Sequence, residues 1–240
     1  MKNLNVFSSL ILAAGVALAG WWIGWGFMHG RAAARFVTVK GVSERDVTAD
    51  IALWPIQFVS TDDDLGSAQA RIKTSKDAIM TFLGRHGFEP SEVEVQRLSV
   101  KDLYADPYKQ GPIESRYIIE QTLMVRTTDC EKVEAAAQAV DEIIEAGVVL
   151  SAQGRQEGPT YLFTRLGDLK PEMIAEATAQ ARRAAEQFAA DSGSQTGKIR
   201  QANQGVFVIL ARDRAPGISE AAQRHKTVRV VSTIEYFLKD

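Results

Sequence analysis

The chain has 240 residues, of which 45% are hydrophobic and 24% are charged, and its formal net charge is −2. This is the composition of an ordinary globular protein, and its charges are too evenly mixed to form a nucleic-acid-binding stripe, so we predict no nucleic-acid partner. The single cysteine, Cys130, excludes an intramolecular disulfide and a cysteine-rich metal site.

The N-terminal segment is apolar. From Leu4 to Met28 no side chain is charged. A helix of about 25 residues, at about 1.5 Å per residue, exceeds the roughly 30 Å hydrocarbon core of a bilayer. The sequence therefore predicts a membrane anchor over residues 1–28, embedded in the lipid bilayer through residues 4–28, and then a tether over residues 29–35.

Three tryptophans, Trp21, Trp22 and Trp25, lie near the end of this apolar run, where they are typical of the membrane interface. Small residues at 17–19 would also suit cleavage of a secretory signal after Ala19. The apolar run continues past that point, however, and cleavage would leave a tryptophan-rich end exposed. We therefore favour retention of the helix.

The chain after the tether changes between strand and helix patterns. Phe36–Lys40 reads as a short strand, a turn is expected around Gly41–Arg45, and Val47–Ser60 reads as a second strand in which Pro55 indicates an edge or a bulge. A helix follows, with a capping segment at Thr61–Asp64 and a stop at Gly84 and Gly87. Its expected apolar face comprises Leu65, Ala68, Ile72, Ile79, Phe82 and Leu83.

Two further strands are expected over residues 92–105 and 115–128, joined by a turn-rich loop over 106–114. Around this loop, Tyr104 and Tyr108 are interleaved with Asp102 and Asp106, a composition found on binding loops. We predict Tyr104, Asp106 and Tyr108 as a candidate partner or assembly loop. The alternative is a solvated hairpin tip.

The remaining elements follow the same pattern. We expect a helix over Asp129–Ala146, strands over 148–154, 159–164 and 198–210, a charged loop over 211–226, and a final strand over 227–238. The longest helix is expected over 169–193, with Pro171 near its first turn. Its predicted packing face is rich in small residues: Ile174, Ala177, Ala181, Ala184, Ala185 and Phe188.

The predicted fold class is α+β, with mainly antiparallel sheets and three principal helices packed on them, preceded by one N-terminal transmembrane helix. Residues 36–240 are enough for one large domain or two intimately packed halves, and we treat them as one domain.

No catalytic, cofactor-binding or metal-binding set is apparent in the sequence. His29, His86 and His225 lie in separate segments, and the acidic run 62–64 is better explained as the start of a helix than as a cation site. Cys130 lies near a predicted helix N-terminus, but acidic neighbours oppose activation of its thiol, so we favour a packing role over redox chemistry.

Several stretches together resemble the SIMPL-domain family of bacterial envelope proteins. They are "FVTVKGVSERDVTADIALWPIQF", "RYIIEQTLMVRTTD", "YLFTRLGDLKPEMIAEATAQARRAAEQFAADSGSQTGKIRQANQGVFVI" and "KTVRVVSTIEYFL", and they cover about residues 36 to 238. The resemblance implies an exported α+β domain of unassigned molecular activity, located in the periplasm. In some members it also implies large ring- or channel-like oligomers and an association with envelope or oxidative stress. It carries no catalytic residues.

Local charges leave the orientation of the anchor open, because Lys2 favours a cytoplasmic N-terminus while Arg31 and Arg35 weakly oppose it. The resemblance implies a single-pass protein of the bacterial inner membrane with a cytoplasmic N-terminus and a periplasmic C-terminal domain. We expect a non-enzymatic homo-oligomer with an envelope or stress-related role, and the envelope protein partner, if there is one, is unknown. The alternatives are a monomeric ligand- or partner-binding module attached to a membrane complex, and an enzyme whose site assembles from different strands.

Overall fold

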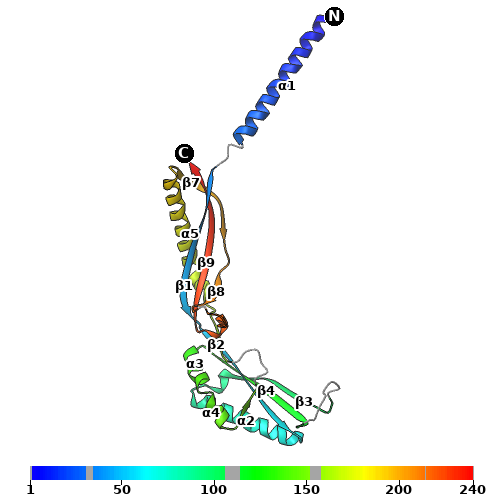
Figure 1. The fold of residues 1–240 in the computed structure, drawn as a ribbon, viewed down its shortest axis with the longest axis vertical. Helices are drawn as coiled ribbons and strands as arrows, with labels where there is room; N and C mark the ends of the chain where they lie inside the picture. Colours follow the sequence, from blue (N-terminus) through cyan, green and yellow to red (C-terminus); the bar gives the residue numbers. More distant parts are fainter. Residues whose placement is uncertain (1, 31–34, 106–113, 152–157, 214, 240) are drawn as a thin grey trace. The chain divides into compact units, whose positions relative to one another are not determined.

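The computed structural model describes residues 2–30, 35–105, 114–151, 158–213 and 215–239, with the side chains of the first helix described over residues 12–26. The fold is α+β with antiparallel sheets, as predicted (Figure 1). The helices are α1 (Lys2–Gly30), α2 (Leu65–Arg85), α3 (Cys130–Gln138), α4 (Asp141–Glu145) and α5 (Leu166–Asp191), with short 3₁₀ turns η1 (Pro90–Glu92) and η2 (Glu220–Ala222). The strands are β1 (Phe36–Thr48), β2 (Ile51–Asp62), β3 (Val93–Asp102), β4 (Tyr117–Thr127), β5 (Val149–Leu150), β6 (Thr160–Leu162), β7 (Gln195–Gln204), β8 (Val208–Ala211) and β9 (His225–Lys239).

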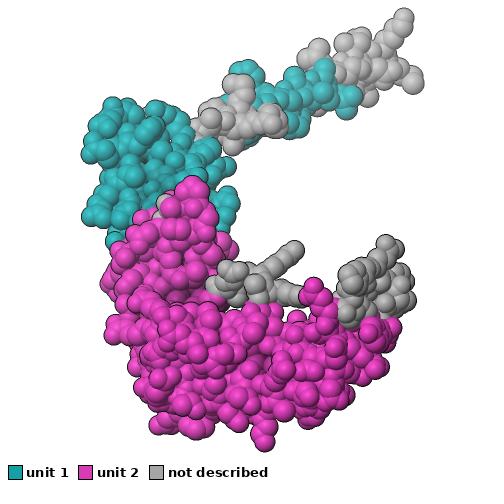
Figure 2. Space-filling model, turned by 60° about the horizontal axis from the view of Figure 1, so that its bottom comes forward, with its two compact units in different colours: residues 1–42, 174–205, 231–240 teal, residues 43–173, 206–230 magenta. Residues whose placement is uncertain are grey.

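The described chain groups into two compact units (Figure 2). Unit 1 comprises residues 1–42, 174–205 and 231–240, and unit 2 comprises residues 43–173 and 206–230. The division falls within β1, α5 and β9.

Helix α1 is continuous over 29 residues. Trp21, Trp22 and Trp25 are all exposed, and the rings of Trp22 and Trp25 meet edge to face at a centroid distance of 6.1 Å. Among the residues that the structure describes, no helix combines the length and the apolar character that crossing a membrane requires. Most of the predicted tether, residues 31–34, lies outside the described residues.

In unit 1, α5 packs on a sheet with the strand order β1-β9-β7. The apolar core between them is small, and it comprises Val37, Val39, Ala181, Ala185, Ile234 and Tyr236, with Leu238 packed against it. The alternation predicted for the last strand is confirmed, since Val228, Val230, Ser232, Ile234 and Tyr236 are all buried.

The turn expected around Gly41–Arg45 is wrong, because β1 continues unbroken from Phe36 to Thr48. Gly41 is needed for close packing instead: a Cβ atom there would lie 1.8 Å from the carbonyl oxygen of Ala177 in α5. The chain reverses only at Ala49 and Asp50, so that the next strand begins later than expected.

Helix α5 also differs from the prediction. It begins at Leu166, so Pro171 lies inside the helix rather than at its start, and one main-chain hydrogen bond is lost there. Its buried face is formed by Met173, Ala177, Ala181, Ala185 and Ala189. The predicted face was therefore right for the alanines at 177, 181 and 185 and wrong for Ala184 and Phe188, which are exposed.

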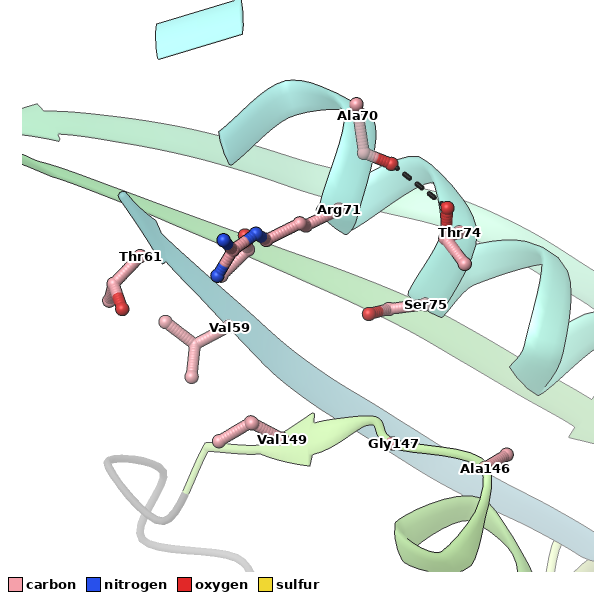
Figure 3. Close-up of a pocket in the computed structure, with 10 residues that line it drawn as sticks. Val59, Thr61, Ala70, Arg71, Thr74, Ser75, Ala146, Gly147 and Val149 are labelled. Atoms are coloured by element: carbon pink, nitrogen blue, oxygen red, sulfur yellow. Dashed lines mark hydrogen bonds between the residues drawn. The ribbon is translucent and has the colours of Figure 1, made fainter. Parts of the chain in front are cut away.

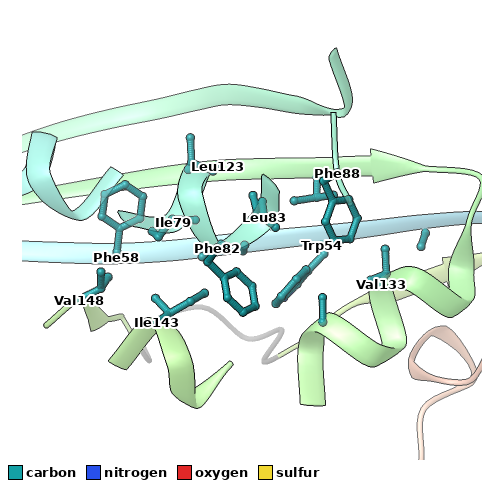
Figure 4. Packing of buried hydrophobic residues seen from close by; sticks show 14 of the residues in the cluster. Trp54, Phe58, Ile79, Phe82, Leu83, Phe88, Leu123, Val133, Ile143 and Val148 are labelled. Carbon is teal, nitrogen blue, oxygen red and sulfur yellow. The ribbon is translucent and has the colours of Figure 1, made fainter. Parts of the chain in front are cut away.

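Unit 2 is built on a sheet with the order β3-β4-β2-β5, and β6 also pairs with β2. The β2–β4 ladder runs from Ala52 opposite Thr127 to Asp62 opposite Tyr117. Helix α2 packs on β2 and β4, and Trp54 meets Phe82 of α2 edge to face with ring centroids 6.5 Å apart (Figure 4). The predicted face of α2 is confirmed except for Leu65, which is exposed.

Pro55 lies in β2 opposite Met124 of β4. On the other side of β2, β6 pairs with residues 51–53 and β5 with residues 58–59, so Pro55 falls between the two described pairings. The proline therefore occupies a local gap of the ladder, where a missing N–H is tolerated.

The single helix expected over Asp129–Ala146 is wrong, since two short helices, α3 and α4, replace it. Near Ala139 the amide bonds reach back only three residues, to Ala136, which tightens the chain and ends α3. The break leaves Ile144 exposed while Val133, Ala136 and Ile143 are buried. The stretch expected to be extended over 198–210 contains most of β7 and most of β8.

One lysine connects α3 to the turn that follows α2. Lys132 Nζ lies 2.8 Å from the carboxylate of Glu92, donates to the carbonyl of Gly87, and sits 4.5 Å from the ring centroid of Phe88. Burial raises the pKa of Glu92, but hydrogen bonds from Lys132, Thr127 and the backbone of Glu89 outweigh burial and lower it to about 2.

Candidate functional site

Strand β3 forms one margin of the unit 2 sheet (Figure 1) and, among the described residues, pairs only with β4. All of its residues are exposed or half-buried. Three large apolar side chains on it are unusually open: Val95, Leu98 and Val100 are 47%, 59% and 52% exposed. A long, apolar edge strand is a template for pairing with another chain, so β3 is a candidate interaction surface.

The register with β4 shows why these side chains are exposed. Val95, Leu98 and Val100 lie opposite Leu123, Gln121 and Ile119, the buried residues of β4, and so share the face that α2 covers. Because α2 packs on β2 and β4, it leaves the β3 margin of that face open.

The predicted partner loop begins directly after β3. Tyr104 is 67% exposed, whereas Asp106 and Tyr108 lie outside the described residues. The Arg116 guanidinium lies over the ring of Tyr104, 5.3 Å from its centroid, and 4.8 Å from that of Tyr117. The base of the loop is therefore an ordered aromatic and cationic surface.

Asp102 secures Arg116 in this position. Asp102 Oδ1 accepts a bond from Arg116 Nε at 3.2 Å, and Asp102 Oδ2 accepts one from a terminal guanidinium nitrogen at 2.9 Å, a bidentate arrangement. The hydrogen bonds from Arg116 hold the pKa of the Asp102 carboxyl below its usual range. The backbone N–H of Arg116 also donates to Asp63 at 3.0 Å.

A cavity of about 420 Å³ opens between β2, α2 and the turn before β5 (Figure 3). Arg71 and Ser75 extend from α2 toward Val59 of β2, and Gly147 and Val149 lie across from them. Arg71 already pairs with Asp62 at 3.0 Å. Because none of the described lining atoms is a buried polar group lacking a partner, this cavity is a weaker candidate than the β3 margin.

Cys130 is buried at the start of α3, and its thiol donates to the carbonyl of Ala49 at 3.4 Å. Burial, with a smaller contribution from Asp50, raises the pKa of the thiol. Nearby Tyr161 is also buried, which raises its pKa to about 12. The protonated, packed thiol agrees with the packing role predicted for Cys130.

The acidic run has the structural role that the sequence indicated for it. Asp64 caps α2 by accepting from Ser67 N at 2.8 Å, while Asp62 pairs with Arg71. His86 packs against Phe82 near Glu142, and His225 begins β9. Within the described ranges, no group of three or more potential metal-ligating side chains is gathered.

The sequence pattern did not reveal the open margin of β3. Alternation of Val95 with Glu94 marks a half-buried strand, but the face that stays open depends on where α2 lies. The signal that could have pointed to it is the combination of apolar residues with the charged residues Glu94, Arg97 and Lys101, a composition typical of edge strands.

Comparison with protein families finds a match to the model described as "SIMPL: Protein of unknown function (DUF541)" over residues 37–235. No curated protein matches the chain. Among solved structures, the regulatory subunit of aspartate kinase from Thermus flavus is similar over 82% of this chain and 89% of its own, at 17% sequence identity and a TM-score of 0.19. That TM-score is too low to support an argument about fold or function.

Proposed function

Because the chain belongs to the SIMPL family, whose activity is unknown, we propose that it is a membrane-tethered, non-enzymatic module that self-associates in the bacterial envelope. The observation that carries this proposal is the open, apolar margin of β3. The proposal includes the periplasmic location and the envelope or stress-related role that the resemblance implied.

The sequence of the whole N-terminal segment supports the tether. Residues 4–28 carry no charge, and the backbone of α1 is helical from Lys2 to Gly30. Trp21, Trp22 and Trp25 are exposed near one end, where indole rings would lie at the lipid headgroups. The proposed orientation has the N-terminus in the cytoplasm and residues 36–240 in the periplasm.

Edge-strand physics supports self-association. An unpaired strand margin that exposes apolar side chains costs solubility unless another chain or element covers it. Three consecutive apolar side chains on one face of β3 meet that description. The Cys130 thiol is buried and its pKa is raised, so it is a poor nucleophile, which supports a role without thiol chemistry.

The tether is tested with the full chain expressed in a Gram-negative bacterium. We expect the protein to resist alkaline extraction from inner membranes, to keep its full mass of 26.3 kDa, and to lose its C-terminal domain to protease only in spheroplasts. A mature protein that begins after Ala19 and is freely soluble would contradict the tether.

A second candidate is a monomeric partner-binding module, favoured by the aromatic surface at Tyr104 and Arg116. In that case the protein would be a monomer with or without Tyr104→Ala, and the substitution would abolish binding to its partner. Self-association instead predicts an oligomer in which Tyr104→Ala leaves the assembly formed by β3 intact.

A further inference from the structure

The β3 margin contains a β-bulge that determines which residues share a face. The register with β4 shifts between Val95 and Arg97, so Gln96 is an extra residue. The bulge keeps Val95 on the same face as Leu98 and Val100. Without it, the strict two-residue period would have turned Val95 to the opposite face.

Three of the four charged side chains of β3 lie on its other face. Glu94, Arg97 and Lys101 stand opposite Met124, Thr122 and Ile118 of β4, whereas Asp102 stands opposite Tyr117 on the face of Leu98 and Val100. Glu94 and Lys101 are both exposed. With Gln96 set aside, the strand therefore alternates an apolar face with a face that is negative at one end and positive at the other.

We infer that β3 pairs antiparallel with β3 of a second copy of this chain, about a two-fold axis at Leu98. This inference rests on the proposed self-association and specifies its partner and register. In this register Val95 meets Val100 of the second copy, and Arg97 meets Ser99 of the second copy. Glu94 meets Lys101 of the second copy, and the symmetry repeats each contact.

Charge distinguishes this register from its neighbours. Moving the two-fold axis by one strand position toward the N-terminus places Arg97 opposite Arg97 of the second copy. Moving it one position the other way places Arg97 opposite Lys101 of the second copy, twice. Like charges directly opposite one another destabilise a sheet, whereas opposite charges stabilise it. Only the register about Leu98 among these three has two opposite-charge pairs and no like-charge pair.

The pairing would also cover the exposed apolar side chains. Leu98 meets its own copy on the face that α2 leaves open, and one Val95–Val100 pair flanks it on each side. Together with the edge hydrogen bonds, these contacts join two five-stranded sheets into one continuous sheet. A two-fold interface of this kind is isologous, so it closes on itself and does not propagate.

A cysteine placed on the axis tests the register in the full chain, purified in mild detergent. In a Cys130→Ser background, which removes the only native cysteine, Leu98→Cys should form an intermolecular disulfide under mild oxidation. Directly opposed residues in antiparallel strands have Cα atoms about 4.5–5.5 Å apart, within the range for a disulfide. The protein with Cys130→Ser alone should form an assembly of the same mass as the unchanged chain, which would show that the substitution does not disturb self-association.

Glu94→Cys in the same background is the matched control on the same strand. Its copies would lie roughly 20 Å apart, too far for a disulfide, so it should not cross-link to itself. An equimolar mixture of Glu94→Cys and Lys101→Cys proteins should cross-link, because those positions face one another. Cross-linking of Glu94→Cys alone as efficient as that of Leu98→Cys would overturn the register.

Charge reversal gives a readout that does not depend on cysteine. Lys101→Glu should weaken dimerisation between about twofold and thirtyfold, and the double exchange Glu94→Lys with Lys101→Glu should restore it. An oligomer that forms without any Leu98→Cys cross-link would refute this interface and leave self-association standing. A strictly monomeric protein would refute both, with the bulge and the edge charges then serving to block edge pairing.

Discussion

Replacement of Gly41 by alanine is expected to push α5 away from its sheet and to destabilise unit 1. The new Cβ atom would lie 1.8 Å from the carbonyl oxygen of Ala177 and 2.7 Å from the amide nitrogen of Ala181. Ordinary contacts between such atoms begin near 3.5 Å, so α5 would have to retreat by roughly 1.5 Å. Both obstructing atoms belong to the helix backbone and cannot rotate away.

The energetic cost follows from the small core of unit 1. Overpacking of this kind usually lowers the free energy of unfolding by about 1–3 kcal/mol. We expect Gly41→Ala to lower it by about 3 kcal/mol or more, because the clash is with rigid backbone and the apolar core beneath α5 is small. Protection of α5 amides from hydrogen exchange should fall by about 100-fold, as measured by mass spectrometry of the full chain.

Gly84→Ala in α2 is the matched control. No atom lies within 4 Å of a Cβ built at Gly84, so alanine should be tolerated there and should stabilise the helix by up to about 1 kcal/mol. If Gly41→Ala were as stable as the unchanged chain, the close approach of β1 and α5 would be wrong, and so would the packing role given to this glycine.

Three further predictions concern buried or paired polar groups. Because the pKa of Glu92 is lowered to about 2, its ionised carboxylate should stabilise the fold above about pH 4.5, and this contribution should be lost as the pH falls toward 2. Urea unfolding should show that loss in the unchanged chain and a smaller loss in Glu92→Gln. Lys226 is fully buried, and its ammonium donates hydrogen bonds to the carboxylate and the backbone carbonyl of Glu220. Glu220→Ala should therefore destabilise the protein by about 3 kcal/mol, because it removes the carboxylate that pairs with a buried charge, and Lys226→Met should destabilise it by less. Equal effects of the two substitutions in thermal unfolding would contradict this explanation. Cys130 should react with iodoacetamide at pH 8 only as fast as the fold opens, and rapid alkylation of the native protein would show that the thiol is neither buried nor protonated.

Helix and strand periods alone predicted most of the elements. Alternation located β4 and β9, and the apolar face of α2 emerged from its 3.6-residue period because one side of that helix meets the sheet directly. The role of Gly41 could not be predicted in the same way. A glycine beside polar residues usually marks a turn. Only the close approach of α5, more than a hundred residues later in the chain, shows that a side chain at position 41 would not fit.

The same limit applies to the interaction surface. Tyr104 was singled out from the composition of its loop, and the structure shows that it is exposed; its contact with a partner stays a prediction. The apolar side of β3 was missed because Val95 and Leu98 lie on the face that also carries the core. Whether such residues are covered depends on the width of the helix layer relative to the sheet, a quantity that no local pattern encodes.

The central claim is that the chain self-associates while tethered to the membrane, and the most direct test is the mass of the full-length protein in mild detergent by light scattering. We predict a defined assembly with an even number of 26.3 kDa chains at micromolar concentration, as two-fold pairing of β3 requires. A single 26.3 kDa chain in the particle, unchanged as the concentration rises, would contradict the account.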